Sequence, residues 1–371
     1  MKIVYISNSI IPSRTANSIH VMKMCQAFAD NGHDVVLLAP DATERYEPGV
    51  EDIYEYYGVK KSFQVKKLFY PNIKGKNIIY NLGILYFLLI NRDNLVYGRY
   101  LFGCYLSSII GRKTILESHA PFGNNSGLEL IIFKKLIKSK KFDKLVVISQ
   151  ELKNIYIKNG YLNDGRILVA HDGADEVVNL DSKLKLNGKN DSLKVGYVGH
   201  LYKGKGVEII DNIADKTSND VEFHIIGGFE KDIKYWKDKI KSENVFFYGF
   251  VQQKEVSMYI NSLDVCLLPN QKIVLPNGAK DDTHNISTFT SPLKMFEYMA
   301  HKKAIISSNI KVLREVLTDK MSILVNPENN DEWIDAIEQM KDDRLREKLS
   351  SNAFKEFKKF TWKVRASSVI K

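Results

Sequence analysis

Short runs of β-branched and aromatic residues alternate with amphipathic stretches along the whole chain. In the first half, the runs that predict strands are 2–7, 34–40, 95–100, 113–118, 144–149 and 167–173. The stretch 18–31 between the first two runs has one apolar face and ends at Gly32, so it predicts a helix. Such alternation is typical of a parallel α/β sheet.

A second series of strands and helices follows a polar interruption. The segment 180–192 is rich in Lys, Asn, Asp and Ser, and we interpret it as a linker. Beyond it, the runs that predict strands are 194–201, 221–228, 245–251, 265–270, 304–308 and 322–327. Ligands of parallel α/β folds bind at the carboxyl ends of the strands, so the loops after these runs are the places to look for a site.

The length of the chain predicts its division into domains. At 371 residues it is longer than one hydrophobic core usually serves. We predict two Rossmann-like α/β domains, at 1–180 and 193–355, that face each other across a cleft. A C-terminal helix within 356–371 is expected to pack back on the N-terminal domain.

Composition narrows the classes of partner. The net charge of +10 and the isoelectric point near 9.1 favour nucleic acid, a membrane surface or a phosphorylated small molecule, although no nucleic-acid-binding module is recognisable. The three cysteines are far apart and form no metal or redox pair, which fits the reducing cytoplasm. The N-terminus lacks the apolar core of a signal peptide, and the apolar run 78–90 is too short to cross a bilayer. We therefore expect a cytoplasmic protein.

The segment 290–306 predicts a helix with an acid on its apolar side. Ser291 stands at the expected N-cap and is followed by a proline at the first helical position. The apolar residues of this helix fall three to four apart and define one face: Leu293, Phe296 and Ala300. Glu297 falls on the same face, where the pattern favours an apolar residue.

The start of this helix predicts an anion site, because the first amides of a helix have no acceptor within it. The amides of Leu293 and Lys294 would point at phosphate oxygens. Glu297 lies one turn further, about 6 Å along the axis, which is the spacing from a pyrophosphate to its ribose. A carboxylate there could accept hydrogen bonds from two ribose hydroxyls. The alternative is that Glu297 lies at the edge of the apolar stripe and reaches water.

A Gly-rich turn gives a second candidate anion site. The segment 196–210, GYVGHLYKGKGVEII, predicts a strand, a turn and a helix start, with Lys205 inside the turn. Glycines let backbone amides approach a ligand, and a lysine can contact phosphate as a point charge. The glycine spacing is not that of a dinucleotide fingerprint. A structural turn with solvated lysines is the alternative interpretation.

Two residues of the first half lie at expected strand ends. His119 follows the run 113–118, where active-site residues of α/β folds gather, although a lone histidine is more often structural. Arg99, in YGRY, is a weaker candidate for the acceptor site.

The stretch 130–144 combines apolar residues with the basic residues Lys134, Lys135 and Lys138. A basic amphipathic helix can lie on an anionic membrane. It can equally be a core-facing helix with a solvated lysine face, and both interpretations stay open.

Several segments resemble one family in order and spacing. In the second half they are GYVGHLYKGKG, VFFYGFV, SLDVCLLPN, SPLKMFEYMAHKKAII and ILVNPENNDEWIDAI. In the first half they are ANSIHVMKMCQAFADNGHDVVLLAP, VVISQELK and ILVAHDGAD. The chain resembles, over nearly its whole length, the retaining glycosyltransferases of family 4, which have the GT-B fold. This resemblance implies an N-terminal acceptor-binding domain and a C-terminal domain that binds a nucleotide sugar.

The resemblance also implies roles for individual residues. Glu297 is similar to the family's ribose-binding glutamate, and Lys205 to its pyrophosphate-binding lysine. His119 is similar to a histidine near the reacting sugar, where it would orient the sugar and stabilise developing charge. The remaining residues implied in donor binding are Asn17, Gly199, His200, Val251, Ser291, Leu293 and Lys294.

Three positions depart from the family pattern. His200 stands where an arginine is frequent, so that one contact to the diphosphate would be weaker or titratable. The first of the two usual glutamates falls on Phe289. The Gly-Gly of the first loop falls on Ala16 and Asn17.

The resemblance implies a retaining, hexosyltransferase-type enzyme that moves a sugar from a UDP or GDP sugar to a glycan or lipid-linked acceptor in cell-surface polysaccharide or glycoconjugate biosynthesis. We expect no cofactor and no metal, because the adjacent Asp281 and Asp282 do not form an Asp-x-Asp site. The enzyme could act on the inner face of the membrane, with no nucleic-acid partner. The alternative is a non-catalytic GT-B protein that binds a nucleotide sugar or a partner enzyme.

Overall fold

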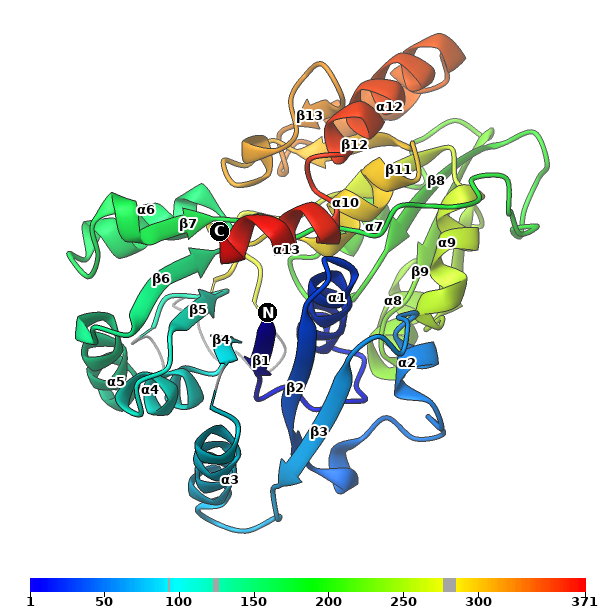
Figure 1. Cartoon of the computed structure of the whole chain (residues 1–371). Helices are drawn as coiled ribbons and strands as arrows, with labels where there is room; N and C mark the ends of the chain where they lie inside the picture. The colour runs from blue at the N-terminus through cyan, green and yellow to red at the C-terminus, as the bar shows by residue number, and fades with distance from the viewer. Residues whose placement is uncertain (93, 123–126, 276–284) are drawn as a thin grey trace. The chain divides into compact units, whose positions relative to one another are not determined.

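The computed structural model of the chain describes residues 1–371 except 93, 123–126 and 276–284 (Figure 1). The chain forms two compact units. Unit 1 contains Met1–Asp172 and Trp362–Lys371, and unit 2 contains Gly173–Thr361. Unit 1 ends at Asp172 rather than at residue 180, because the following segment hydrogen-bonds within unit 2: the amide of Ala174 donates to Phe360 O, and Asn179 O accepts from Asn261 Nδ2.

Unit 1 is built on a seven-stranded parallel sheet with the order β3-β2-β1-β4-β5-β6-β7. Its strands are β1 (Lys2–Ile6), β2 (Asp34–Asp41), β3 (Gln64–Phe69), β4 (Asn94–Gly98), β5 (Thr114–Ser118), β6 (Phe142–Val147) and β7 (Ile167–Val169). The strand β3 was missing from the sequence prediction. It lies at the sheet edge, and its lysines interrupt the apolar pattern by which buried strands are recognised.

Helices cover both faces of this sheet. The helices of unit 1 are α1 (Ala16–Asp30), α2 (Ile53–Tyr56), α3 (Lys76–Ile90), α4 (Leu101–Ile109), α5 (Gly127–Lys138), α6 (Gln150–Lys158) and α13 (Trp362–Ile370). On one face α1 packs against the C-terminal helix α13, and on the other α3 packs against α4, which packs against α5 (Figure 1). Right-handed crossovers put α1 opposite α3, α4 and α5, because the strand order reverses between β1 and β4.

Unit 2 has a six-stranded parallel sheet with the order β10-β9-β8-β11-β12-β13. Its strands are β8 (Leu193–Val198), β9 (Val221–Ile226), β10 (Val245–Gly249), β11 (Val265–Leu268), β12 (Ala304–Ser308) and β13 (Ile323–Val325). Its helices are α7 (Val207–Ile213), α8 (Glu230–Lys239), α9 (Gln253–Asn261), α10 (Leu293–Ala300), α11 (Asn330–Gln339) and α12 (Asp343–Phe357). Separate apolar clusters lie on the two faces of the sheet. Both units are therefore doubly wound, Rossmann-like α/β domains, as the sequence predicts.

Within the described ranges, no helix is both long enough and apolar enough to cross a bilayer.

Candidate donor site and candidate catalytic cluster

The Gly-rich turn of unit 2 connects β8 to α7. Gly204 and Gly206 have positive φ angles of +85° and +98°, and a Cβ on either would lie 2.1 Å from a carbonyl oxygen, of Ile273 and of Pro269 respectively. Only glycine fits this close approach. The amides of both glycines donate to the carboxylate of Glu208, at 2.9 and 3.1 Å. In this structure, the two glycine amides are therefore satisfied within the turn, and the side chain of Lys205 is the candidate to contact a ligand.

Two lysines define a cationic site beside this turn. Lys205 is half-buried, with Nζ 5.1 Å from the centre of the Tyr202 ring. Lys294, on α10, is buried, with Nζ 3.6 Å from the centre of the Tyr197 ring and no hydrogen-bond partner among the described residues. Burial lowers the pKa of Lys205 to about 8. Burial, followed by the charge of Lys205, lowers the pKa of Lys294 well below its usual value, and Glu297 acts in the opposite direction.

Helix α10 begins one residue later than the sequence predicts. Pro292, not Ser291, is the N-cap, and its extended conformation places Leu293 at the first helical position. Ser291 is buried and precedes the N-cap, which corrects the prediction. The correction has a physical reason, since proline fixes its own φ but can still adopt the extended ψ of an N-cap. The first-turn amides of Leu293 and Lys294 have no acceptor within the helix.

Glu297 lies on the partly exposed side of α10, not on its buried face. Leu293 and Glu297 are both half-buried. The residues that α10 buries are Lys294, Met295, Phe296, Tyr298, Met299 and Ala300. The predicted apolar face was therefore partly wrong. Most side chains of α10 are buried, and only the side with Leu293 and Glu297 is partly exposed. Glu297 Oε1 accepts a hydrogen bond from Gln253 Nε2 at 3.2 Å.

The other residues implied in donor binding occupy different surroundings. The ring of His200 stacks against those of Phe229 and Tyr202, with centroids 5.1 and 6.0 Å away. The Gly199 amide donates to Ile226 O at 2.9 Å, and Val251 is half-buried just after β10. Phe289, where the family pattern has a glutamate, is buried. Asn17 belongs to unit 1, in the first turn of α1, and its Oδ1 is buried without a partner in the described chain.

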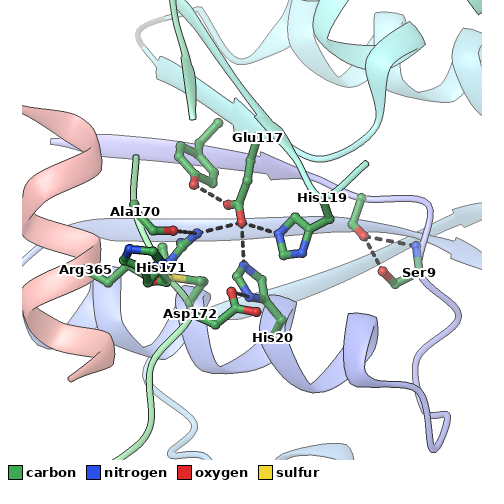
Figure 2. Close-up of polar contacts among 11 residues, drawn as sticks. Ser9, His20, Glu117, His119, Ala170, His171, Asp172 and Arg365 are labelled. Atoms are coloured by element: carbon green, nitrogen blue, oxygen red, sulfur yellow. Dashed lines mark hydrogen bonds and ion pairs between the residues drawn. The ribbon is translucent and has the colours of Figure 1, made fainter. Parts of the chain in front are cut away.

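His119 belongs to a buried cluster in unit 1 that the sequence did not reveal (Figure 2). It follows β5, and its Nε2 lies 2.6 Å from Oε1 of Glu117, a fully buried residue of that strand. The same oxygen lies 2.8 Å from His20 Nε2 and accepts from Arg365 Nη2 at 2.9 Å. The Tyr97 hydroxyl donates to the other oxygen of Glu117. Helices α1 and α13, strand β4 and the loop after β5 each supply one residue that contacts this strand-borne carboxylate.

The cluster extends to a second carboxylate. His20 Nδ1 lies 2.9 Å from Asp172 Oδ1, so His20 bridges Asp172 and Glu117 (Figure 2). Arg365 also donates to the carbonyl oxygens of His171 and Ala170, at 2.9 and 3.2 Å. These contacts hold the guanidinium of Arg365 beside Glu117.

The charges of the cluster follow from these contacts. Burial acts to raise the pKa of Glu117, but the charges of Arg365 and His20 outweigh it and hold that pKa well below its usual range. Burial and then the charge of Arg99 lower the pKa of His119 to about 3. His119 is therefore neutral near pH 7. Because ionised Glu117 can only accept, the proton of His119 resides on Nε2, and Nδ1 is left as an acceptor.

Arg99, the weaker acceptor-site candidate, acts electrostatically on His119. It follows β4, and its side-chain Nη1 is buried without a hydrogen-bond partner among the described residues. After burial, its charge is the next cause that lowers the pKa of His119. Burial raises the pKa of Tyr5, and the charge of Arg99 opposes that rise. The structure therefore brings His119 and Arg99 to one site.

The same cluster has the composition of a metal site. The ligand atoms of His20, Glu117, His119 and Asp172 all lie within 4.8 Å of one another. However, the guanidinium of Arg365 contacts the Glu117 oxygen that a cation would need. A fixed positive charge at this place opposes a second cation. We interpret the cluster as a hydrogen-bonded network that orients His119.

The remaining predicted residues are not part of either site. The side chains of Lys134, Lys135 and Lys138 are exposed on α5, whose Phe133, Leu136 and Ile137 are buried. Asp281 and Asp282 lie outside the described residues.

Comparison with known proteins relates the chain to glycosyltransferases. Residues 192–343 match the family model of the glycosyl transferases group 1. An uncharacterized glycosyltransferase of Methanocaldococcus jannaschii is 23% identical over 394 residues, covering 98% of this chain and 95% of the relative. The sucrose-phosphate synthase of Thermosynechococcus elongatus has a TM-score of 0.74 at 15% identity, covering 99% of this chain and 96% of that one. HepE of Anabaena, in complex with UDP, has a TM-score of 0.71 at 15% identity, covering 100% and 98%.

The match and these likenesses confirm the resemblance seen in the sequence. The chain has the GT-B fold, and its residues 192–343 match the glycosyl transferases group 1.

Proposed function

We propose that the chain is a retaining, metal-independent, hexosyltransferase-type enzyme. It would move a sugar from a UDP or GDP sugar to a glycan or lipid-linked acceptor in the synthesis of a cell-surface polysaccharide or glycoconjugate. The observation that carries this proposal is the pair of half-buried Lys205 and buried Lys294, whose Nζ has no hydrogen-bond partner among the described residues of unit 2. Two confined ammonium groups at a helix start suit the diphosphate of a nucleotide sugar. The UDP bound to Anabaena HepE favours the same class of donor.

Each site would have its own part in transfer. In unit 2, Lys205, Lys294 and the first amides of α10 would hold the diphosphate, and Glu297 would accept hydrogen bonds from the ribose. Gly199, His200 and the backbone near Val251 would complete the nucleotide site. In unit 1, Nδ1 of neutral His119 would accept a hydrogen bond from the sugar and stabilise positive charge that develops on its ring. Arg99 would contact the acceptor, and Asn17 would lie near the donor or the acceptor.

Retention would follow from attack on the face that the leaving diphosphate vacates. The diphosphate takes the proton of the acceptor hydroxyl, so the protein need not supply a covalent nucleophile. The lysines then have to stabilise a leaving group whose charge grows in the transition state.

A thermal-shift screen against nucleotides and nucleotide sugars, with and without EDTA, tests this proposal. The correct nucleoside diphosphate should raise the melting temperature with or without magnesium, because a ligand that binds only the folded state stabilises it. Slow hydrolysis of the matching sugar donor without acceptor, with the anomer retained, would support an enzyme. Activity that EDTA abolishes and manganese restores would contradict the metal-independent mechanism. Tight binding with neither hydrolysis nor transfer would favour a non-catalytic nucleotide-sugar-binding protein.

A further inference from the structure

Helix α3 carries apolar side chains on two opposite faces. One face is buried in the core cluster of unit 1, through Tyr80, Ile84, Phe87 and Leu88. The other is exposed, through Ile78, Leu82, Tyr86, Leu89 and Ile90, whose exposed fractions are 66%, 60%, 68%, 46% and 58%. At 3.6 residues per turn these two sets point in opposite directions. The helix is thus already anchored by its inner face and still presents a second apolar stripe to the outside.

The apolar surface continues into the chain before the helix. Phe69, at the end of β3, is 70% exposed, and Ile73, in the loop before α3, is 57% exposed. We call these two residues and the outer stripe of α3 the α3 surface. Single exposed apolar residues are ordinary, but a contiguous group marks an interaction site. The loop 72–77, which includes Ile73, also lines a pocket.

The chain segment that carries the α3 surface is basic, and an acid beside it is Glu44, which accepts a hydrogen bond from Asn72. Between residues 64 and 92 the sequence has no Asp or Glu, and its basic residues are Lys66, Lys67, Lys74, Lys76 and Arg92. Lys66 and Lys74 are exposed. Two copies of the chain that met through this surface would bring like charges together. An anionic lipid surface instead complements the charges and accepts the apolar side chains.

The neighbouring helices α4 and α5 also expose apolar and basic side chains. Helix α4 packs against α3 and α5 on this side of the sheet, as Figure 1 shows. Ile109 of α4 is 57% exposed, and Leu128 and Ile131 of α5 are 58% and 52% exposed. The exposed lysines of α5, Lys134, Lys135 and Lys138, lie among them.

From this combination we infer that the α3 surface binds an anionic membrane. The helix lies in the plane of the bilayer interface with its outer stripe among the acyl chains, while Lys66 and Lys74 contact lipid phosphates. At 15 residues α3 lies on the bilayer and does not cross it. This inference rests on the surface of unit 1 alone and does not depend on the proposed transfer reaction.

Sedimentation of the full-length protein with lipid vesicles tests the inference. Wild-type protein should bind phosphatidylcholine vesicles that contain phosphatidylglycerol, and should bind pure phosphatidylcholine far more weakly. The combined variant Ile78→Ser, Leu82→Ser, Tyr86→Ser should lower the partition coefficient about tenfold or more, because the apolar stripe is what enters the bilayer. These side chains are exposed, so its melting temperature should stay near that of the wild type.

A matched variant controls for the loss of exposed apolar residues in general. Ile157→Ser, Val178→Ser, Tyr235→Ser removes three such residues that lie elsewhere, and should bind vesicles like the wild type. Lys66→Glu, Lys74→Glu should weaken binding to anionic vesicles and reduce its dependence on salt.

Four outcomes would overturn the inference. The first is wild-type protein that does not sediment with anionic vesicles, and the second is binding that survives the three serine substitutions. The third is binding that only Lys134→Glu, Lys135→Glu, Lys138→Glu removes, which would show that α5 is the membrane-binding helix. The fourth is a lipid-free dimer that the α3 variant dissociates, which would assign the surface to a second copy of the chain.

Discussion

The ammonium group of Lys294 lies 3.6 Å from the centre of the Tyr197 ring, and no described residue accepts a hydrogen bond from it. The ring face offers a partial substitute for the water that burial removes. It does not replace an anion, because a buried cation needs a paired charge. Lys205 adds a second positive charge to the same surroundings. We interpret this site as incomplete without an anionic ligand.

Binding of a nucleoside diphosphate should therefore take up protons. Lys205 has a pKa of about 8, and that of Lys294 is lowered well below its usual value, so part of their charge is absent near pH 8. A bound diphosphate favours the protonated forms and raises both pKa values. Calorimetry at pH 8 in buffers of different ionisation enthalpy should show net proton uptake. Affinity should fall as the pH rises above 8.

The variants of the two lysines separate their contributions to this uptake. Lys205→Arg should remove the part that belongs to Lys205, because a guanidinium stays charged, and should keep part of the stabilisation by ligand. Lys205→Ala should remove most of that stabilisation. Binding without proton uptake in the wild type would show that both lysines are already charged, and would contradict this account of the site.

Glu297→Gln should reduce transfer severely and leave the fold intact. The side chain lies on the open side of α10, so its charge is not needed for packing. Loss of the carboxylate should weaken ribose binding by about 1.5 to 3 kcal/mol. Steady-state rates at subsaturating donor and a melting curve measure the two effects. Gln253→Ala removes only the neighbouring donor to Glu297 and should cost less. Near-normal turnover of Glu297→Gln would show that Glu297 does not bind the donor.

His119→Ala should lower turnover more than donor affinity, because its contact strengthens only as charge develops on the sugar. Glu117→Gln should lower turnover as well. An amide can donate as well as accept, so the proton of His119 is no longer held on Nε2. The two variants differ in stability. Glu117→Gln leaves Arg365 buried without its counter-ion, and loss of one partner of a buried pair typically costs about 3 to 5 kcal/mol. An affinity defect with unchanged turnover in His119→Ala would contradict its proposed role.

The two candidate sites differ in how much of each could be predicted from the sequence. Lys205 lies in a Gly-rich turn and Glu297 near a helix start. Both features have local sequence patterns, so the surroundings of these two residues could be predicted. The burial of Lys294 could not be predicted, because this residue of α10 packs against Tyr197 of the distant strand β8. The N-cap of α10 was misplaced by one residue, since the sequence Ser-Pro satisfies two capping arrangements. The alternation of strands and helices, and with it the parallel α/β class of both units, was in contrast visible in the sequence.

The cluster around Glu117 was beyond the reach of sequence patterns. Its members come from α1, β5, α13 and the segment after β7, and Arg365 is 248 residues away from Glu117. The one local signal was Glu117 itself, an acid inside the apolar strand TILES. Such an acid requires a partner, but the sequence does not say which.

The stability of the protein should fall as the pH drops below 6.5. Burial lowers the pKa of His119 to about 3, and those of His224 and His301 to about 4, so the folded protein keeps all three neutral. The unfolded chain protonates them near 6.5 and therefore binds more protons at pH 5, which favours unfolding. Each histidine should contribute about one proton to the slope of unfolding free energy against pH near pH 5. Denaturant titrations between pH 7.5 and 4.5 measure this slope. The slope should be about one proton smaller in His119→Asn, and an unchanged slope in that variant would show that His119 is protonated in the folded state.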